Sequence, residues 1–159
     1  MNILFVCSAN MSRSFLAEKL LGKEVEMLNL RDVSVSSAGL YASGLNQPDR
    51  NMVEYLSEIG IPSSEHRPKQ ISKKDINRAN IILVMENAHA TMIRELWPEA
   101  KDKLELFGKF VSAGPMVDDI VDPFGRSSYH YRLARSQLTL AIKNFANKLL
   151  LDQENRRIS

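Results

Sequence analysis

The sequence predicts an α/β protein of three layers, in which helices cover both faces of a central four-stranded parallel sheet. Two continuous apolar runs, Ile3–Val6 and Ile81–Met85, are typical of strands buried on both faces. Segments with helical periodicity lie between and after these runs, so strands and helices alternate along the chain. Such alternation implies right-handed crossovers and places a ligand at the carboxyl ends of the strands. The loop that starts at Cys7, directly after the first strand, is therefore the expected ligand site.

The first half of the chain supplies two predicted helices and a second strand. Residues 13–21 have helical spacing of apolar side chains, and Gly22 marks the expected end of that helix. Val33–Ser36 is the second predicted strand. The segment 48–59 has an apolar face of helical period, which predicts another helix.

The second half continues the alternation. Ser72–Asp75 resembles a capping box that opens a short helix before the strand at residues 81–85. Asn87 is expected to cap a helix that runs to Leu96. Residues 104–107 are the predicted fourth strand, at the edge of the sheet.

The chain ends in a long predicted helix over residues 128–150, because apolar side chains recur there at helical spacing. Residues 152–159 show no apolar periodicity and are expected to fray. No internal repeat or interdomain linker interrupts the sequence, so residues 1–151 are predicted to form a single domain.

Composition excludes several classes of function. A chain of 159 residues with 44% hydrophobic residues and a net charge of +2 predicts a globular protein rather than a disordered one. Its interspersed charges give no field suited to nucleic acid, and no apolar stretch is long enough to cross a membrane. The N-terminus lacks the basic start of a signal peptide, so a cytoplasmic location is expected. One cysteine excludes an intramolecular disulfide, a four-cysteine zinc site and a resolving thiol in the same chain.

The loop after the first predicted strand, Cys7–Ser14, combines three features of an oxyanion site with a nucleophile. Its small polar residues precede a helix N-terminus, where successive N–H groups can form an anion-binding hollow. Arg13 can bind two oxygens of a phosphate with its planar guanidinium. Cys7 ends the strand beside this positive hollow, which would stabilise its thiolate. The five residues between Cys7 and Arg13 can wrap around one tetrahedral oxyanion.

A plainer interpretation of this loop is a buried apolar cysteine followed by a surface arginine. The spacing Cys-x5-Arg is common by chance and does not decide between the two interpretations. The loop has neither the Gly-Lys-Ser/Thr of ATP-binding loops nor the Gly-x-Gly-x-x-Gly of dinucleotide sites. Its position at a strand-to-helix junction favours a functional site.

The segment Phe5–Ser14, followed by Ala17 and Glu18, resembles the active-site segment of the low-molecular-weight protein tyrosine phosphatases, V-C-x-G-N-x-C-R-S-P and then A-E. Five further stretches resemble that family in the same order along nearly the whole chain. They are Ser36–Gly39, Asn46–Asp49, Gly60–Pro62, His66–Ile71 and Asp122–Gly125.

Three loop positions depart from the family pattern. Ala9 replaces a glycine, and if that position requires a positive φ, alanine would be strained by about 1 kcal/mol. Ser12 replaces the second loop cysteine. Phe15 replaces the proline that usually opens the helix, so the preset φ of the first turn is lost. None of these changes removes a reacting group.

The resemblance implies a role for each site residue in phosphomonoester hydrolysis. Cys7 would be the nucleophile, Arg13 the phosphate ligand and Asp122 the general acid and base. No metal or other cofactor is implied. The remaining positions would bind substrate or support the loop: Ser8, Ala9, Asn10, Met11, Ser12 and Ser14 around the phosphate, Tyr41 and Phe124 beside an aromatic ring, and Ser37 and His66 behind the loop.

Some assignments stay open at the level of sequence. Asp118 and Asp119 compete with Asp122 as the acid, and only the Asp-Pro-Phe-Gly context of the resemblance selects Asp122. Tyr41 and Phe124 could be ordinary packing residues. His89 and His130 lie on predicted helices and are expected at the surface.

The expected substrate is a phosphorylated protein or a small aryl phosphate, with inorganic phosphate or another oxyanion binding at the Cys7–Arg13 loop. The resemblance favours phosphotyrosine. A related subgroup acts on phosphoarginine and has a small polar residue at the position of Met11, so Met11 favours phosphotyrosine over that alternative. An inactive phosphate-binding member of the family is a further alternative. A related arsenate reductase is disfavoured, because it relays oxidation through additional cysteines.

Overall fold

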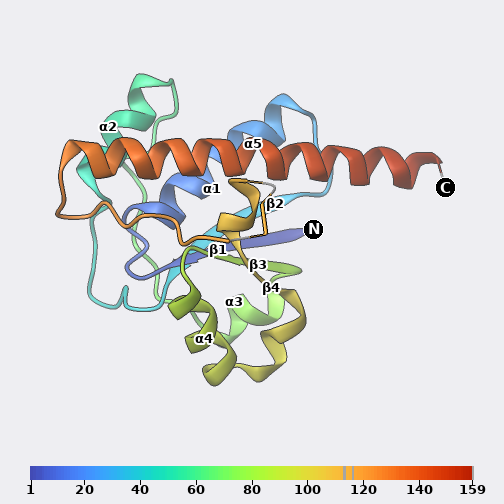
Figure 1. The fold of residues 1–159 in the computed structure, drawn as a ribbon, viewed down its shortest axis with the longest axis horizontal. Coiled ribbons are helices and arrows are strands. Elements are labelled where there is room, and N and C mark those ends of the chain that lie inside the picture. The colour runs from blue at the N-terminus through green and yellow to red at the C-terminus, as the bar shows by residue number, and fades with distance from the viewer. Residues whose placement is uncertain (113, 116, 159) are drawn as a thin grey trace.

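The computed structural model describes residues 1–112, 114–115 and 117–158 (Figure 1). Its sheet has four parallel strands in the order β2-β1-β3-β4. These strands are β1 (Asn2–Cys7), β2 (Ser34–Gly39), β3 (Ile81–Val84) and β4 (Leu104–Leu106). The four-stranded parallel sheet predicted from the sequence is confirmed.

Helices cover both faces of this sheet, which gives the three predicted layers (Figure 1). One layer contains α1 (Arg13–Met27), α2 (Arg50–Glu58) and α5 (Ser128–Ile158). The opposite layer contains α3 (Lys73–Arg78) and α4 (Asn87–Leu96).

Strand β1 connects the two hydrophobic cores because its side chains alternate between the faces of the sheet. Ile3 and Phe5 lie in the larger core, with apolar residues of α1, α2 and α5. Leu4 and Val6 lie in the smaller core, with apolar residues of α3 and α4. Cys7 faces the same core as Ile3 and Phe5 and is 3% exposed. Burial on both faces explains why this strand is a continuous apolar run in the sequence.

Helix α1 and strand β2 extend beyond their predicted ends. Gly22 does not end α1, which runs on to Met27 because the residues after Gly22 are mostly good helix formers that offset its cost of about 1 kcal/mol. Strand β2 continues past Ser36 because it pairs with β1 as far as Cys7 and Gly39. Pairing with β1 therefore sets the end of β2, whereas helix propensity accounts for the length of α1.

Helix α5 continues to Ile158, so the expectation of a frayed tail is corrected for residues 152–158, while Ser159 lies outside the described residues. Lys148 and Asp152 form an i,i+4 ion pair at 3.0 Å between Nζ and Oδ2. The side-chain oxygen of Gln153 accepts a hydrogen bond from the N–H of Arg31 at 2.8 Å. Although α5 is long, no helix in the described parts of the chain is apolar over enough residues to cross a membrane.

A close backbone contact positions the segment that leads to Asp122. Gly108 lies in the short 3₁₀ helix η2 (Phe107–Phe110), and a Cβ atom added there would lie 1.9 Å from the carbonyl oxygen of Asp118. Because that neighbour is backbone, a side chain at position 108 would displace the whole segment 118–122.

We predict that Gly108→Ala lowers the free energy of unfolding by about 1–3 kcal/mol, because the added methyl group overpacks a fixed backbone contact. The measurement is urea denaturation followed by circular dichroism. Gly22→Ala is the matched control, since nothing lies within 4 Å of a Cβ atom at that helical position. The control should be more stable than the wild type by about 0.5–1 kcal/mol. Equal effects of the two substitutions would contradict the assignment of Gly108 as a packing contact.

Candidate active site

The loop of residues 7–14 lies between β1 and α1, at the carboxyl edge of the sheet. Strand β1 has β2 on one side and β3 on the other, so the chain order reverses here, where ligands bind in open α/β sheets. The loop encloses a small cleft of about 60 Å³. The residues that line this cleft are Cys7, Ser8, Ala9, Met11, Ser12, Arg13, Asp122 and Phe124.

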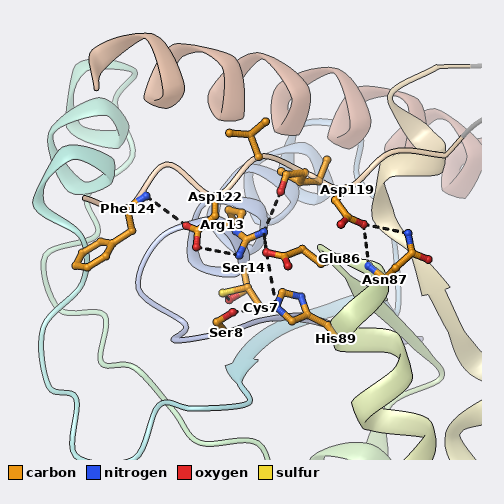
Figure 2. Close-up of polar contacts among 12 residues, drawn as sticks. Cys7, Ser8, Arg13, Ser14, Glu86, Asn87, His89, Asp119, Asp122 and Phe124 are labelled. Atoms are coloured by element: carbon orange, nitrogen blue, oxygen red, sulfur yellow. Dashed lines mark hydrogen bonds and ion pairs between the residues drawn. The ribbon is translucent and has the colours of Figure 1, made fainter. Parts of the chain in front are cut away.

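A buried hydrogen-bond network surrounds the sulfur of Cys7. The Cys7 Sγ atom lies 2.9 Å from the Ser14 hydroxyl oxygen (Figure 2). The side-chain amide of Asn10 donates to this hydroxyl and to the Ser37 hydroxyl, both at 2.9 Å. Because the Ser14 oxygen already accepts from Asn10, its own proton is free to point at the sulfur. Ser14 can therefore stabilise a thiolate at Cys7.

The strained residue of the loop is Asn10, whose φ is +56°, and not Ala9. Asparagine tolerates this left-handed region better than most residues. The expectation of strain at Ala9 is therefore corrected, since the residue that replaces the family glycine has an ordinary φ. Lys69 fixes Asn10 further, because its N–H donates to the Asn10 side-chain oxygen at 2.9 Å.

The end of β2 packs directly against the loop backbone. A Cβ atom on Gly39 would lie 2.8 Å from backbone atoms of Ser8, Ala9 and Asn10, so only glycine fits there. Two residues after this glycine, the N–H of Tyr41 donates to the carbonyl of Ser8 at 2.7 Å. The motif Ser36–Gly39 thus supports the loop through a close approach of two backbones.

A buried carboxylate anchors the outer part of the loop. Asp49 is 4% exposed and accepts hydrogen bonds from the Ser12 hydroxyl and, at 2.7 Å, from the Tyr131 hydroxyl. Its own N–H donates to the carbonyl of Met11 at 2.9 Å. Burial, together with the bond to the carboxylate, raises the pKa of Tyr131 to about 12. Asp49 thereby ties the loop to the start of α2 and to α5.

The guanidinium of Arg13 is almost fully buried, and three partners hold it (Figure 2). Its Nη1 atom lies 2.6 Å from a carboxylate oxygen of Glu86 and donates to the carbonyl of Ile120 at 2.9 Å. Its Nη2 atom lies 3.5 Å from the carboxylate of Asp122. Sequence reasoning missed Glu86, although its place two residues after β3, the strand next to β1, was a signal that it lies near Arg13.

The three aspartates near residue 120 have different surroundings. Asp119 accepts from the N–H and the side-chain amide of Asn87, at 2.8 and 3.1 Å, and so caps the start of α4. Of these three aspartates, Asp122 alone lines the cleft, and its side chain is half exposed. This geometry favours Asp122 over Asp118 and Asp119 as the group that reaches a bound substrate.

His89 is buried, although the sequence predicted it at the surface. Its Nε2 atom lies 2.9 Å from the Ser8 hydroxyl and 3.9 Å from Glu86 (Figure 2). Burial and the nearby Arg13 lower the pKa of His89, so the ring is neutral at pH 7. The correction arises because the first turn of α4 packs against the loop, a contact between residues far apart in sequence. His130, the other histidine expected at the surface, is partly exposed and pairs with the Ser127 hydroxyl at 2.8 Å.

Two exposed aromatic side chains were predicted beside the substrate. Phe124 is 55% exposed and lines the cleft, as expected. Tyr41 is 63% exposed, and its side chain does not line the cleft in this structure. Its backbone N–H, rather than its ring, contacts the loop.

A cysteine, a buried arginine and a half-exposed carboxylate around one phosphate-sized cleft form the arrangement of a cysteine-dependent phosphatase. A family model described as low molecular weight phosphotyrosine protein phosphatase matches residues 2–155. The chain belongs to this family.

Among the relatives of this chain, some are named protein-arginine phosphatases and others protein-tyrosine phosphatases. The chain is 40% identical to a protein-arginine-phosphatase of Geobacillus stearothermophilus, over 95% of this chain and 97% of the relative. It is 34% identical to a putative low molecular weight protein-tyrosine-phosphatase of Klebsiella pneumoniae, over 79% of this chain and 81% of the relative. A solved YwlE arginine phosphatase, a cysteine-to-serine mutant with a phosphorylated active-site serine, superposes with a TM-score of 0.87 at 29% identity and full coverage of both chains.

We predict that Tyr131→Phe removes a pH-dependent part of the stability. The raised pKa of Tyr131 keeps its hydroxyl protonated in the folded state up to about pH 12, whereas the unfolded chain releases this proton near pH 10. The wild type should therefore lose stability as the pH rises from 10 to 12, in excess of any loss in the variant. Urea denaturation at pH 9, 10 and 11 measures this difference, and parallel curves for the two proteins would contradict it.

Proposed function

We propose that the protein removes phosphate from phosphorylated side chains of proteins through a cysteinyl-phosphate at Cys7. The observation that carries the proposal is the position of the Cys7 sulfur in the cleft, beside the Ser14 hydroxyl and the buried Arg13. The phosphorylated active-site serine in the related cysteine-to-serine mutant supports a covalent intermediate at this position.

In the first proposed step, the Cys7 thiolate attacks phosphorus, the S–P bond forms and the bond to the leaving atom breaks. Asp122 gives its proton to the leaving oxygen, so the product departs as a neutral alcohol or phenol. Its half-exposed side chain at the mouth of the cleft is within reach of a leaving group that points to solvent.

In the second proposed step, water attacks the phosphorus, and the ionised Asp122 accepts a proton from it. The S–P bond breaks, and the Ser14 hydroxyl donates to the sulfur that leaves as a thiolate. Inorganic phosphate is released, and the site returns to its starting state.

Charge in both transition states falls on the equatorial phosphate oxygens. Arg13 and the N–H groups of the loop are the donors for these oxygens. Because Glu86 and the Ile120 carbonyl hold the guanidinium from behind, little reorganisation is needed when the substrate binds. Both proposed steps use side chains and backbone N–H groups of this chain, with one water molecule in the second step.

We propose phosphotyrosine as the preferred substrate. The exposed ring of Phe124 and the side chain of Met11 give the cleft an apolar rim, which suits an aromatic ring. A sulfur at the bottom of the cleft also favours a long phosphorylated side chain over phosphoserine.

Phosphoarginine is the second candidate, because the arginine phosphatase relative is 40% identical over 95% of this chain. The leaving atom would then be a guanidine nitrogen, and Asp122 would protonate it in the same way. Met11 argues against this substrate, since its thioether sulfur is only a weak acceptor for the N–H groups of a guanidinium.

An inactive phosphate-binding role is less well supported. It would rest on Ala9 and Phe15, but the positive φ falls on Asn10 and α1 starts at Arg13 despite the missing proline. The three reacting side chains remain at one cleft.

We predict metal-independent hydrolysis of phenyl phosphate in the presence of EDTA, inhibited by vanadate and abolished by Cys7→Ser. Turnover that survives this substitution would exclude Cys7 as the nucleophile.

Asp122→Ala should lower kcat for phenyl phosphate by about 10²–10⁴-fold, because the leaving oxygen needs a proton. The loss should be smaller with p-nitrophenyl phosphate, whose leaving group needs less protonation.

Asp118→Ala is the matched control for Asp122→Ala, since it removes an exposed aspartate from the same segment. It should leave kcat near the wild-type value with both substrates. An equal loss in the two variants would exclude Asp122 as the specific acid.

Substrate preference is tested with matched peptides that carry phosphotyrosine or phosphoarginine. We predict a higher kcat/KM for phosphotyrosine in the wild type and a shift toward phosphoarginine in Met11→Thr, because threonine replaces an apolar rim by a hydroxyl. A wild-type preference for phosphoarginine would reassign the substrate and leave the chemistry of Cys7 unchanged.

A further inference from the structure

The ring of Phe15 lies face to face with the ring of His66, at the back of the loop. The ring centroids are 4.2 Å apart and the ring planes differ by 18°. Phe15 is fully buried in the third position of α1, whereas His66 comes from the connection between α2 and α3. The stack is therefore a long-range contact between two segments that meet behind the cleft.

His66 transmits this contact to the loop. Its Nε2 atom lies 2.8 Å from the carbonyl oxygen of Asn10, the loop residue with a positive φ. Because a carbonyl only accepts, Nε2 must carry the proton and donate. Burial lowers the pKa of His66, so at pH 7 the ring is neutral and this proton is its only N–H.

The orientation of one peptide group follows from this bond. In a trans peptide, the carbonyl of Asn10 and the N–H of Met11 point in opposite directions. Since His66 binds the carbonyl, the N–H of Met11 points away from His66, an orientation compatible with an N–H that faces the cleft. Met11 lines that cleft and His66 does not.

We propose that Phe15 is a positioning residue for the phosphatase reaction, which holds His66 so that the Met11 N–H stays directed at the phosphate. The path runs from the Phe15 ring through His66 to the Asn10 carbonyl, and each contact on it is short. Without the ring, His66 can rotate, and the Asn10–Met11 peptide can turn its N–H out of the cleft. This inference rests on the proposed function, in which loop N–H groups stabilise the equatorial oxygens.

The test is Phe15→Leu, which keeps an apolar side chain and removes the stacked ring. We expect kcat for phenyl phosphate to fall about tenfold with a smaller change in KM, because loss of a whole oxyanion donor costs about 10²–10³-fold and misorientation costs less. Nitrogen-15 spectra of the histidine ring should show a single protonated Nε2 in the wild type and a mixture of tautomers in the variant.

Phe145→Leu is the matched control. Phe145 is an equally buried helical phenylalanine, but its ring packs on Phe110 and Phe107 instead of a histidine. It should lower Tm by a similar amount and leave kcat and the His66 spectrum unchanged. Equal losses of kcat in both variants would overturn the proposal, since the effect would then follow general loss of core packing.

A double-mutant cycle tests the path itself. If Phe15 acts through His66, Phe15→Leu should cause no further loss of kcat once His66→Ala is present. Additive losses would overturn the role of His66 as the intermediary. Should Phe15→Leu not fold, Phe15→Met carries the same expectations, because it fills the space with a flexible chain that cannot stack.

Phosphate binding separates this inference from the proposed function. Calorimetric titration with inorganic phosphate should give weaker binding to Phe15→Leu than to Phe145→Leu. A wild type that binds phosphate but turns over no phosphorylated substrate would overturn the proposed function, and the binding comparison would still decide the role of Phe15.

Discussion

The buried guanidinium of Arg13 is the constraint around which the site is built. A charge this deeply buried is costly unless it is paired and hydrogen-bonded. Its three partners come from two separate segments, since Glu86 follows β3, whereas Ile120 and Asp122 both lie in the connection to α5. Arg13 therefore fixes the position of each segment relative to the loop. The same side chain also lines the cleft.

The loop itself depends on supports that lie outside the cleft. Gly39 approaches its backbone from β2, Asp49 binds it from the start of α2, and the first turn of α4 contacts it through His89. The shape of the loop therefore depends on segments that are distant from it in the sequence. This explains why the resemblance to the family extends over most of the chain and is not confined to Cys7–Ser14.

Local patterns were sufficient to predict the parallel sheet and the order of strands and helices along the chain, whereas the resemblance to the family selected the proposed reacting residues. Continuous apolar runs predicted β1 and β3, and the motifs around Cys7 and Asp122 predicted two residues that the fold brings to one cleft. Glu86 and His89 were not predicted, because their roles depend on contacts between distant segments. The length of α1 was misjudged because a single glycine is a weak stop signal inside a stretch of good helix formers.

The same limit applies to the fine geometry of the loop. The family pattern placed the expected strain at Ala9, yet the positive φ belongs to Asn10, which no periodicity or spacing could have indicated. The connectivity of Asn10 explains it, since its amide and carbonyl bind Ser14, Ser37 and His66 at once. Several bonds converge on one residue and over-determine its backbone.

The hydrogen bond from the Ser12 hydroxyl to Asp49 has a consequence for oxidative damage. Peroxide would convert the Cys7 thiolate to a sulfenic acid. Ser12, which stands where the family pattern has a second cysteine, has no thiol to form a disulfide with it, and its hydroxyl is bound to Asp49. With no other cysteine in the chain, no internal disulfide can protect the sulfenic acid from further oxidation to the irreversible sulfinic acid. Recovery of the protein from such an event therefore depends on thiols supplied by its surroundings.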